Sequence, residues 1–98
     1  MMRARIAQAL SRYDKIAVWG AGGLGTQALD RWLPRDRIVC IIDANPRKHG
    51  QPLAGIPVIG PGEADFAALD CIVVCITAYL EVFETLKARR VTEDVFYV

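Results

Sequence analysis

Short apolar runs alternate with segments of helical periodicity along most of the chain. The runs lack polar alternation, which is typical of parallel strands buried on both faces of a sheet. The pattern predicts five strands, at residues 16–19, 37–43, 56–59, 71–76 and 95–98. It also predicts helices at residues 2–13, 24–33 and 62–69, and a last helix that Thr77 can cap and that ends near Arg90.

Three of the predicted helices have an apolar side, which we expect to pack against the rest of the domain. These sides consist of Ile6, Ala9, Leu10 and Tyr13 in the first helix, of Leu24, Ala28, Leu29 and Trp32 in the second, and of Leu80, Phe83 and Leu86 in the last. The first helix could instead be the end of a linker from a neighbouring domain.

The alternation of strands and helices indicates an α/β fold with a mainly parallel sheet. Right-handed crossovers predict the strand order 3-2-1-4-5, as in a Rossmann-like three-layer sandwich. A proline near the start of the 56–59 strand is consistent with an edge position. In this order a ligand crevice lies between the carboxyl ends of the first and fourth strands.

Size and composition predict one domain over residues 1–98, with an N-terminal amphipathic helix within residues 1–14. The chain has 98 residues, of which 53% are hydrophobic, and a formal net charge of +1. This charge gives no electrostatic reason to expect nucleic acid as a partner. No apolar run approaches the roughly 18 residues of a membrane span, and three cysteines in apolar runs are typical of reduced core residues. We therefore expect a cytoplasmic protein without nucleic-acid or membrane partners.

A glycine-rich turn follows the first strand. Gly20, Gly22 and Gly25 fill the fixed positions of the G-x-G-x-x-G pattern found in dinucleotide-binding turns. The first glycine allows a tight turn, the second lets the backbone approach a pyrophosphate, and the third lets helix and strand pack closely. Phosphates would lie against the positive end of the helix dipole. The predicted ligand contacts of this turn are Gly20, Ala21, Gly22, Gly23, Leu24 and Gly25. The alternative is a tight connection without a ligand.

An acidic residue ends the second strand, near the distance from the glycines that is expected of a ribose ligand. The carboxylate of Asp43 would accept the ribose hydroxyls and repel a ribose 2′-phosphate, which favours NAD over NADP. Ala44 and Asn45, which follow it, are further candidate contacts. Arg47 and Lys48 could weaken the preference for NAD, although a solvated basic turn is the simpler interpretation.

The residues after the fourth strand are expected on the other side of the crevice. Ile76, Thr77 and Tyr79 are the candidate ligand contacts there. Tyr79 could line a pocket together with Trp19, or both side chains could simply pack. The Tyr-x-x-x-Lys pair of short-chain dehydrogenases is missing because Phe83 occupies the lysine position. The sequence therefore predicts no catalytic residue.

The cysteines and the single histidine do not form a metal-binding pattern. On one strand, Cys71 and Cys75 would lie about 13 Å apart, and Cys40 belongs to another strand. Core thiols are the simpler interpretation. His49 falls on a polar turn, where we expect a solvated side chain.

From Lys15 to Val98 the sequence resembles small Rossmann-like domains that are attached to sugar-modifying enzymes. The resemblance rests on WGAGGLG in the first turn, IIDANPRKHG after the second strand and LAGIPVIGP at the third. Similar patterns occur in the N-terminal domains of bacterial amino-sugar acetyltransferases, in nucleotide-sugar dehydratases of polysaccharide biosynthesis and in the C-terminal domains of sugar C-methyltransferases. In the acetyltransferases this domain holds a UDP-sugar, so the resemblance implies that the three motif glycines and Asp43 contact the ligand. The sequence contains neither the repeated left-handed helix domain of the acetyltransferases nor the methyl-transfer domain.

These observations together predict a nucleotide- or dinucleotide-binding module for NAD or a UDP-sugar. We expect it to be associated with sugar or polysaccharide modification and to lack catalysis of its own. The alternatives are a small NAD-dependent oxidoreductase and a structural or assembly domain whose glycine turn is empty. The apolar edge segments 56–59 and 95–98 carry no charge, so we also expect a homodimer or docking to a sugar-modifying enzyme. A monomer would result if the first helix covered its own edge of the sheet.

Overall fold

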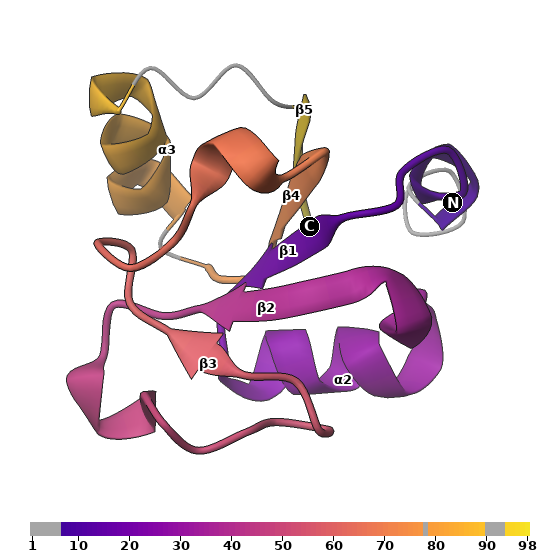
Figure 1. Ribbon diagram of the computed structural model, residues 1–98, viewed down its shortest axis with the longest axis horizontal. Coiled ribbons are helices and arrows are strands. Elements are labelled where there is room, and N and C mark those ends of the chain that lie inside the picture. Colours follow the sequence, from indigo (N-terminus) through magenta and orange to yellow (C-terminus); the bar gives the residue numbers. More distant parts are fainter. Residues whose placement is uncertain (1–6, 78, 90–93) are drawn as a thin grey trace.

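A sheet of five parallel strands forms the centre of the molecule. The computed structural model describes residues 7–77, 79–89 and 94–98. The strands are β1 (Ile16–Trp19), β2 (Ile38–Ile42), β3 (Val58–Ile59), β4 (Cys71–Val74) and β5 (Asp94–Tyr97). They lie in the order β3-β2-β1-β4-β5, and all neighbours are parallel (Figure 1). The predicted α/β fold and the predicted strand order are confirmed.

The central strands form where the apolar runs are uninterrupted. Every residue of β1 and of β4 is buried, as expected of parallel strands that are covered on both faces. The edge strand β3 is shorter than predicted. Ile56 forms an antiparallel bridge with Leu53 instead of continuing the sheet, and Pro57 has no N–H to donate to a neighbouring strand.

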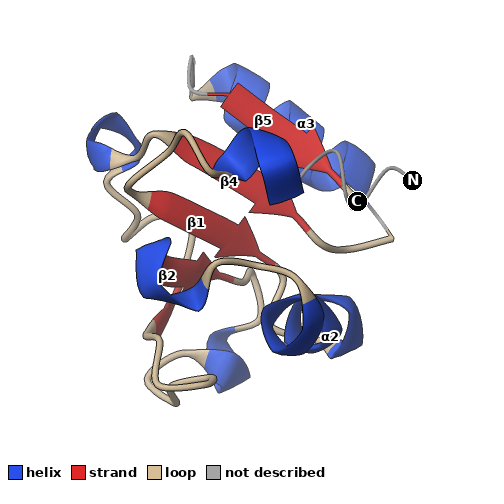
Figure 2. Ribbon diagram, turned by 90° about the vertical axis from the view of Figure 1, so that its right-hand side faces the viewer, coloured by secondary structure: helices blue, strands red, loops and turns tan. Residues whose placement is uncertain are grey.

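Helices lie on both faces of the sheet. On one face α2 (Gly23–Arg31) buries Ala28 and Leu29 in a core cluster with Val18. On the other face α3 (Tyr79–Ala88) buries Val82 and Leu86 in a second cluster. Figure 2 shows β1, β4 and β5 side by side, with α3 behind β4 and β5 and the helical turn of residues 7–10 in front of them. The predicted three layers are therefore present.

The apolar sides of the two longer helices differ in part from the predicted ones. In α3, Leu80 is 66% exposed and Phe83 is 45% exposed, whereas Val82 and Leu86 are buried. In α2, Leu24 is 37% exposed. Apolar side chains surround much of α3, so that two stripes have helical spacing, and only packing against the sheet selects one of them.

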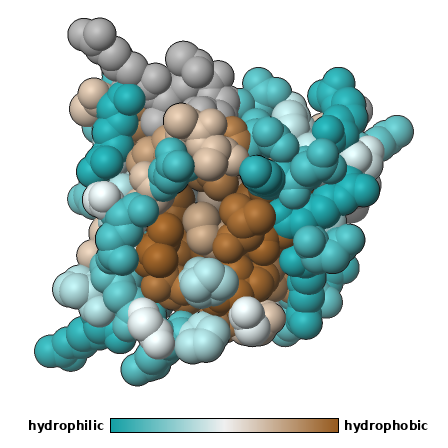
Figure 3. Space-filling view, viewed as in Figure 1, coloured by the Kyte–Doolittle hydropathy of each residue, from teal (hydrophilic) through white to brown (hydrophobic). Residues whose placement is uncertain are grey.

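The segment between β3 and β4 contains less helix than predicted. Within residues 62–69 only Phe66–Ala68 forms a turn of 3-10 helix, and Gly62 at the start of this segment has a low helix propensity. On this face, opposite α2, the side chains of Cys40 and Ile59 are only half-buried against the second core cluster. Figure 3 shows apolar side chains at the centre of this view, surrounded by hydrophilic ones.

The N-terminal segment folds back onto the domain. Residues 7–10 are helical, and Leu10 is fully buried in the first core cluster. The ring of Tyr13 packs edge-on against Phe96 of β5, with centroids 6.2 Å apart, and the Tyr13 hydroxyl donates a hydrogen bond to Asp94. Part of the predicted 2–13 helix, including Ile6, lies outside the described residues.

Among the described residues, no helix is both long enough and apolar enough to cross a bilayer.

Candidate nucleotide-binding site

The glycine-rich turn lies where β1 and β4 end, as predicted. Gly20 has a φ of +124°, which side chains rarely adopt, and a Cβ there would lie 2.7 Å from the carbonyl oxygen of Cys75. A Cβ at Gly25 would lie 1.9 Å from the carbonyl oxygen of Gly20. Both positions therefore require glycine for backbone packing. They have the structural roles that the motif assigns to its first and third glycines.

Gly22 has a different environment. Its φ is −87°, and a Cβ there would meet only the Nζ atom of Lys48, at 3.6 Å. Gly22 is the N-cap of α2, which has no side-chain cap and no acidic residue in its first turn. The Thr26 N–H donates to the carbonyl of Gly22, so the N–H groups before Thr26 precede the first intrahelical bond. Gly22 thus lies beside free donors and the positive end of the helix dipole.

Asp43 connects the end of β2 to this turn. Its Oδ2 accepts a hydrogen bond from the Ala21 N–H at 2.9 Å, and its Oδ1 accepts one from the Asn45 N–H at 2.8 Å. A carboxylate has about four lone-pair positions, so both oxygens can still accept a bond from a ligand. The half-buried side chain lies where a ribose-binding carboxylate is expected. The two bonds to backbone N–H groups were not predicted.

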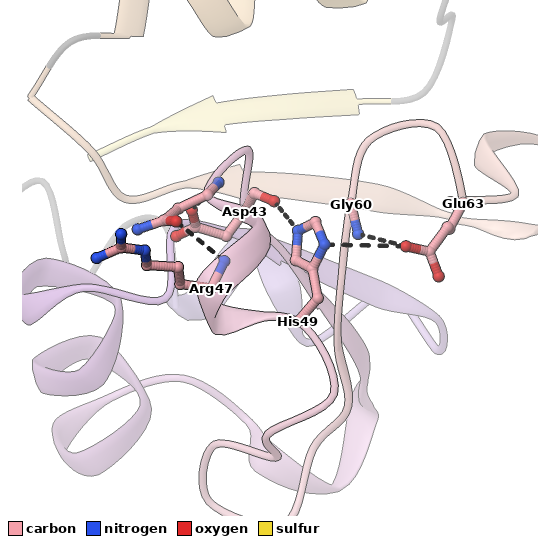
Figure 4. Close-up of polar contacts among 6 residues, drawn as sticks. Asp43, Arg47, His49, Gly60 and Glu63 are labelled. Carbon is pink, nitrogen blue, oxygen red and sulfur yellow. Dashed lines mark hydrogen bonds and ion pairs between the residues drawn. The ribbon is translucent and has the colours of Figure 1, made fainter.

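His49 holds the loop after Asp43 in place (Figure 4). Its Nε2 lies 2.6 Å from the carbonyl oxygen of Asp43 and donates to it. Its Nδ1 lies 4.0 Å from Oε1 of Glu63, which accepts a bond from the Gly60 N–H at 3.3 Å. The prediction of a solvated histidine is wrong, because the half-buried His49 ring joins the loop after β2 to the loop after β3.

Lys48 extends from the same loop toward the glycine-rich turn. The 3-10 turn Pro46–Lys48 begins at Asn45, whose side chain accepts a bond from the Arg47 N–H at 3.0 Å. Arg47 is exposed, whereas Lys48 is half-buried and, together with Ala21, lines a notch of about 210 Å³. The interpretation as a solvated basic turn therefore holds for Arg47 and is wrong for Lys48.

A small cavity of about 160 Å³ opens beside Asp43. Its floor includes Trp19, whose ring is stacked on Phe66 with centroids 6.3 Å apart. The lining residues are Trp19, Asp43, Ala44, Pro61, Ile76, Glu81, Val82 and Thr85. Apolar walls with two carboxylates suit an uncharged planar ring better than a phosphate, which like charges would repel.

Most of the predicted contact residues come together at this edge of the sheet. They are the residues 20–25 of the glycine-rich turn, Asp43, Ala44 and Asn45 of the loop after β2, and Ile76 after β4. Thr77 is exposed and does not line the cavity. Tyr79 is 49% exposed and packs against Tyr97, with ring centroids 5.7 Å apart. Of the two aromatic candidates, only Trp19 lines the cavity, because the first turn of α3 directs Tyr79 toward β5.

Four polar residues of this region were not among the predicted ligand contacts. They are Lys48, His49, Glu81 and Thr85. A signal existed for the last two, since they lie four positions apart in the helix that follows the fourth strand, and such residues share one helix face. The Asn-Pro pair at 45–46 was a second signal, because it predicts a capped turn that fixes the loop after Asp43.

Two of the three cysteines lie in the core, and burial disfavours the reactive thiolate form of all three. Burial raises the pKa of the Cys71 thiol to about 12 and that of the Cys75 thiol to about 11. Burial also raises the pKa of the half-buried Cys40 thiol. Protonated thiols are poor nucleophiles, and in the described part of the chain no three metal-ligating side chains converge. The predicted core position is confirmed for Cys71 and Cys75.

Solved structures with the same fold include two dehydrogenases and a repressor that binds β-NADH. UDP-D-quinovosamine 4-dehydrogenase from Vibrio fischeri has a TM-score of 0.68 at 15% identity, over 88% of this chain and 78% of that chain. The Rex-family repressor RSP in complex with β-NADH has a TM-score of 0.65 at 17% identity, over 97% of this chain and 58% of that chain. Aspartate semialdehyde dehydrogenase II from Vibrio cholerae has a TM-score of 0.59 at 20% identity, over 85% of this chain and 27% of that chain. At these identities the likeness establishes the fold.

One of these structures corrects an expectation about partners. RSP in complex with β-NAD⁺ and operator DNA has a TM-score of 0.65 at 20% identity, over 97% of this chain and 55% of that chain. The exclusion of nucleic acid, which relied on the near-neutral charge, is therefore wrong, because a protein that contains this fold binds operator DNA.

The family comparison covers most of the sequence. A search of curated proteins gives no match. The C2185-like N-terminal domain family matches residues 12–95. The chain belongs to this family.

Proposed function

We propose that this member of the C2185-like N-terminal domain family is a nucleotide-binding module. The proposed ligand contains a diphosphate and lies across the carboxyl ends of β1 and β4. The observation that carries the proposal is the difference among the motif glycines. Gly20 and Gly25 are required by the backbone around them, whereas Gly22 has no such packing constraint and lies beside the free N–H groups of α2.

Three neighbouring positions correspond to three parts of such a ligand. The start of α2 would hold the phosphates, Asp43 would accept the ribose hydroxyls, and the cavity of about 160 Å³ would hold the base. Asp43 links these positions, because its carboxylate bonds to Ala21 of the turn and also lines the cavity.

The ligand is NAD or a nucleotide-sugar in this proposal. Asp43 disfavours a ribose 2′-phosphate and so favours NAD over NADP, and the RSP structures with β-NADH and β-NAD⁺ share the fold. The segments IIDANPRKHG and LAGIPVIGP favour a nucleotide-sugar through their resemblance to sugar-modifying enzymes. A dehydrogenase named for a UDP-sugar is also among the fold neighbours. The association with sugar or polysaccharide modification rests on these two likenesses.

Calorimetry with the purified chain tests the proposal, using NAD, NADP, UDP and UDP-glucose as probes. We expect at least one of them to bind, and we expect Gly22→Val to weaken that binding about tenfold or more, because its side chain would occupy the phosphate position. The melting temperature should change little, since a Cβ at Gly22 would meet only the flexible end of Lys48. Gly62→Val is the matched control, because it makes the same substitution at a glycine whose Cβ would meet no atom within 4 Å.

Two outcomes would contradict the proposal. In the first, the folded wild-type chain binds none of the four probes, and mass spectrometry finds no nucleotide released from the purified protein. In the second, Gly22→Val binds as tightly as the wild type. The first outcome would favour a structural domain whose glycine turn is empty.

A further inference from the structure

The position of one lysine extends the proposed site beyond its motif. We infer that Lys48 binds the diphosphate of the ligand and makes the site select a nucleoside diphosphate over a nucleoside. This inference rests on the proposed function, to which it adds a charged residue that neither the glycine motif nor Asp43 supplies. Its starting observation is that the Lys48 Nζ atom lies 3.6 Å from where a Cβ of Gly22 would be.

The ammonium group of Lys48 lies beside the place where the backbone would approach a pyrophosphate. Gly22 occupies the second glycine position of the motif, which has that role in dinucleotide-binding turns. The free N–H groups at the start of α2 are on the same turn. The N-terminus of α2 and the charged ammonium group of Lys48 therefore both lie beside Gly22 and both produce a positive potential there. An anion placed there could accept hydrogen bonds from both.

Lys48 has no acidic partner among the residues that the structure describes. The ion pairs there are Arg35–Asp30, at 2.7 Å, and His49–Glu63, at 4.0 Å. The carboxylate oxygens of Asp43 bond instead to the N–H groups of Ala21 and Asn45. Lys48 as a residue is half-buried, and a charge in a partly buried position is more favourable when a counter-charge lies beside it. A bound diphosphate would supply that charge.

The backbone that carries Lys48 is held on both sides. Before it, the Asn45 side chain accepts a bond from the Arg47 N–H. After it, His49 Nε2 donates to the carbonyl oxygen of Asp43. These bonds fix the turn so that Lys48 faces the glycines while Arg47 remains exposed. The loop therefore fixes the backbone position from which the Lys48 side chain reaches the glycine-rich turn.

The same geometry disfavours a ribose 2′-phosphate as the partner of Lys48. A 2′-phosphate would lie beside the ribose, where the carboxylate of Asp43 would repel it. The Lys48 Nζ atom lies instead at the glycine-rich turn. Lys48 thus points to the diphosphate, which NAD and the nucleotide-sugars have in common.

Calorimetry on the full chain can test this role of Lys48 with ADP, UDP, adenosine and uridine, together with NAD, NADP and UDP-glucose. For the diphosphate that the wild type binds, we expect Lys48→Gln to lower the affinity about ten- to hundredfold, as for loss of a charge-assisted hydrogen bond. The affinity for the corresponding nucleoside should not change. Arg47→Gln is the matched control, because it removes the same charge from the same turn at an exposed position. We expect it to change the affinity for the diphosphate by less than about threefold.

The possible failures are distinguishable. If the wild type binds ADP or UDP and Lys48→Gln binds it equally well, or loses no more affinity than Arg47→Gln, the inference is wrong and the proposed function stands. If Lys48→Gln weakens NADP binding but not ADP binding, the lysine serves a 2′-phosphate and the inference is again wrong. If the folded wild type binds none of NAD, ADP, UDP and UDP-glucose, the proposed function fails, and the role of Lys48 fails with it.

Discussion

At the scale of single residues, the glycines of the turn are not equivalent. The motif gives Gly20 and Gly25 structural roles and Gly22 a role at the ligand, and their neighbours in the structure separate them in the same way. A substitution at a structural position tests the fold, and a substitution at Gly22 tests binding. Only the first kind should affect stability in the absence of a ligand.

Gly25→Ala should strongly destabilise the protein. The added Cβ would lie 1.9 Å from the carbonyl oxygen of Gly20, and this backbone atom cannot rotate away. We expect a loss of about 3 kcal/mol in the free energy of unfolding, which lowers the melting temperature by about 10 °C or more. Thermal unfolding measures this directly. Gly22→Ala is the control and should stay within about 1 kcal/mol of the wild type. Equal melting temperatures for the two variants would contradict the close approach of α2 to β1.

Asp43 should also contribute to stability without a ligand. Asp43→Ala removes the acceptor of the Ala21 and Asn45 N–H groups, so we expect a loss of about 2 kcal/mol in the free energy of unfolding, within the range for hydrogen bonds to charged groups. Urea denaturation of the ligand-free protein measures it. Asp65→Ala is the control, because Asp65 is exposed and its side chain caps nothing. A loss no greater than that of the control would mean that the carboxylate does not hold the turn.

At the scale of the elements, the sequence predicts strands better than helix faces. The runs that became β1 and β4 are apolar throughout and short, so they have one interpretation. In α3 the predicted stripe of Leu80, Phe83 and Leu86 has helical spacing, and so do Val82 and Leu86, which are the residues that pack. To choose between the two stripes one must know the direction in which the chain leaves β4. The periodicity of the sequence gives no information on that direction.

Substitutions in α3 can verify which stripe packs. Leu86 is 4% exposed and Leu80 is 66% exposed. Leu86→Ala should cost about 2–5 kcal/mol through lost burial and a cavity, whereas Leu80→Ala should cost less than about 0.5 kcal/mol. The two variants remove the same atoms from one helix, so helix propensity cancels in their comparison. The orientation predicted from the sequence places both side chains inward, so urea denaturation that gave Leu80→Ala as large a loss as Leu86→Ala would favour it.

The candidate site was predictable in part for a related reason. The glycine turn, Asp43 and Ile76 lie at the ends of strands, and the strand order places such ends together. Lys48 and His49 depend instead on the path of a loop, which the Asn45 side chain and the Asp43 carbonyl fix through particular hydrogen bonds. No periodicity describes these bonds, so neither residue could be placed from the pattern.

At the scale of the whole molecule, buried thiols connect stability to alkaline pH. Burial raises the pKa of Cys71 to about 12 and that of Cys75 to about 11, from an ordinary value of 9.0. Above that ordinary value the unfolded chain loses thiol protons that the folded chain retains. The folded state then binds more protons, so the free energy of unfolding falls as pH rises. The stability that the two protonated thiols contribute is fully present below the thiol pKa of the unfolded chain. It is lost progressively between pH 9.0 and the raised pKa values of the folded state.

Stability should therefore decrease between about pH 8 and about pH 10.5, on the order of 1 kcal/mol per pH unit for each thiol once the unfolded thiols ionise. Urea denaturation across this range measures the slope. The double variant Cys71→Ala with Cys75→Ala should be less stable at neutral pH, because it loses buried atoms, but should have a flatter slope. Burial also raises the pKa of Tyr97. Its ionisation lowers the stability of the wild type and of the double variant alike, so its effect cancels when their slopes are compared. Parallel slopes would mean that the thiols ionise no later in the folded core than in the unfolded chain, contrary to their complete enclosure in the sheet.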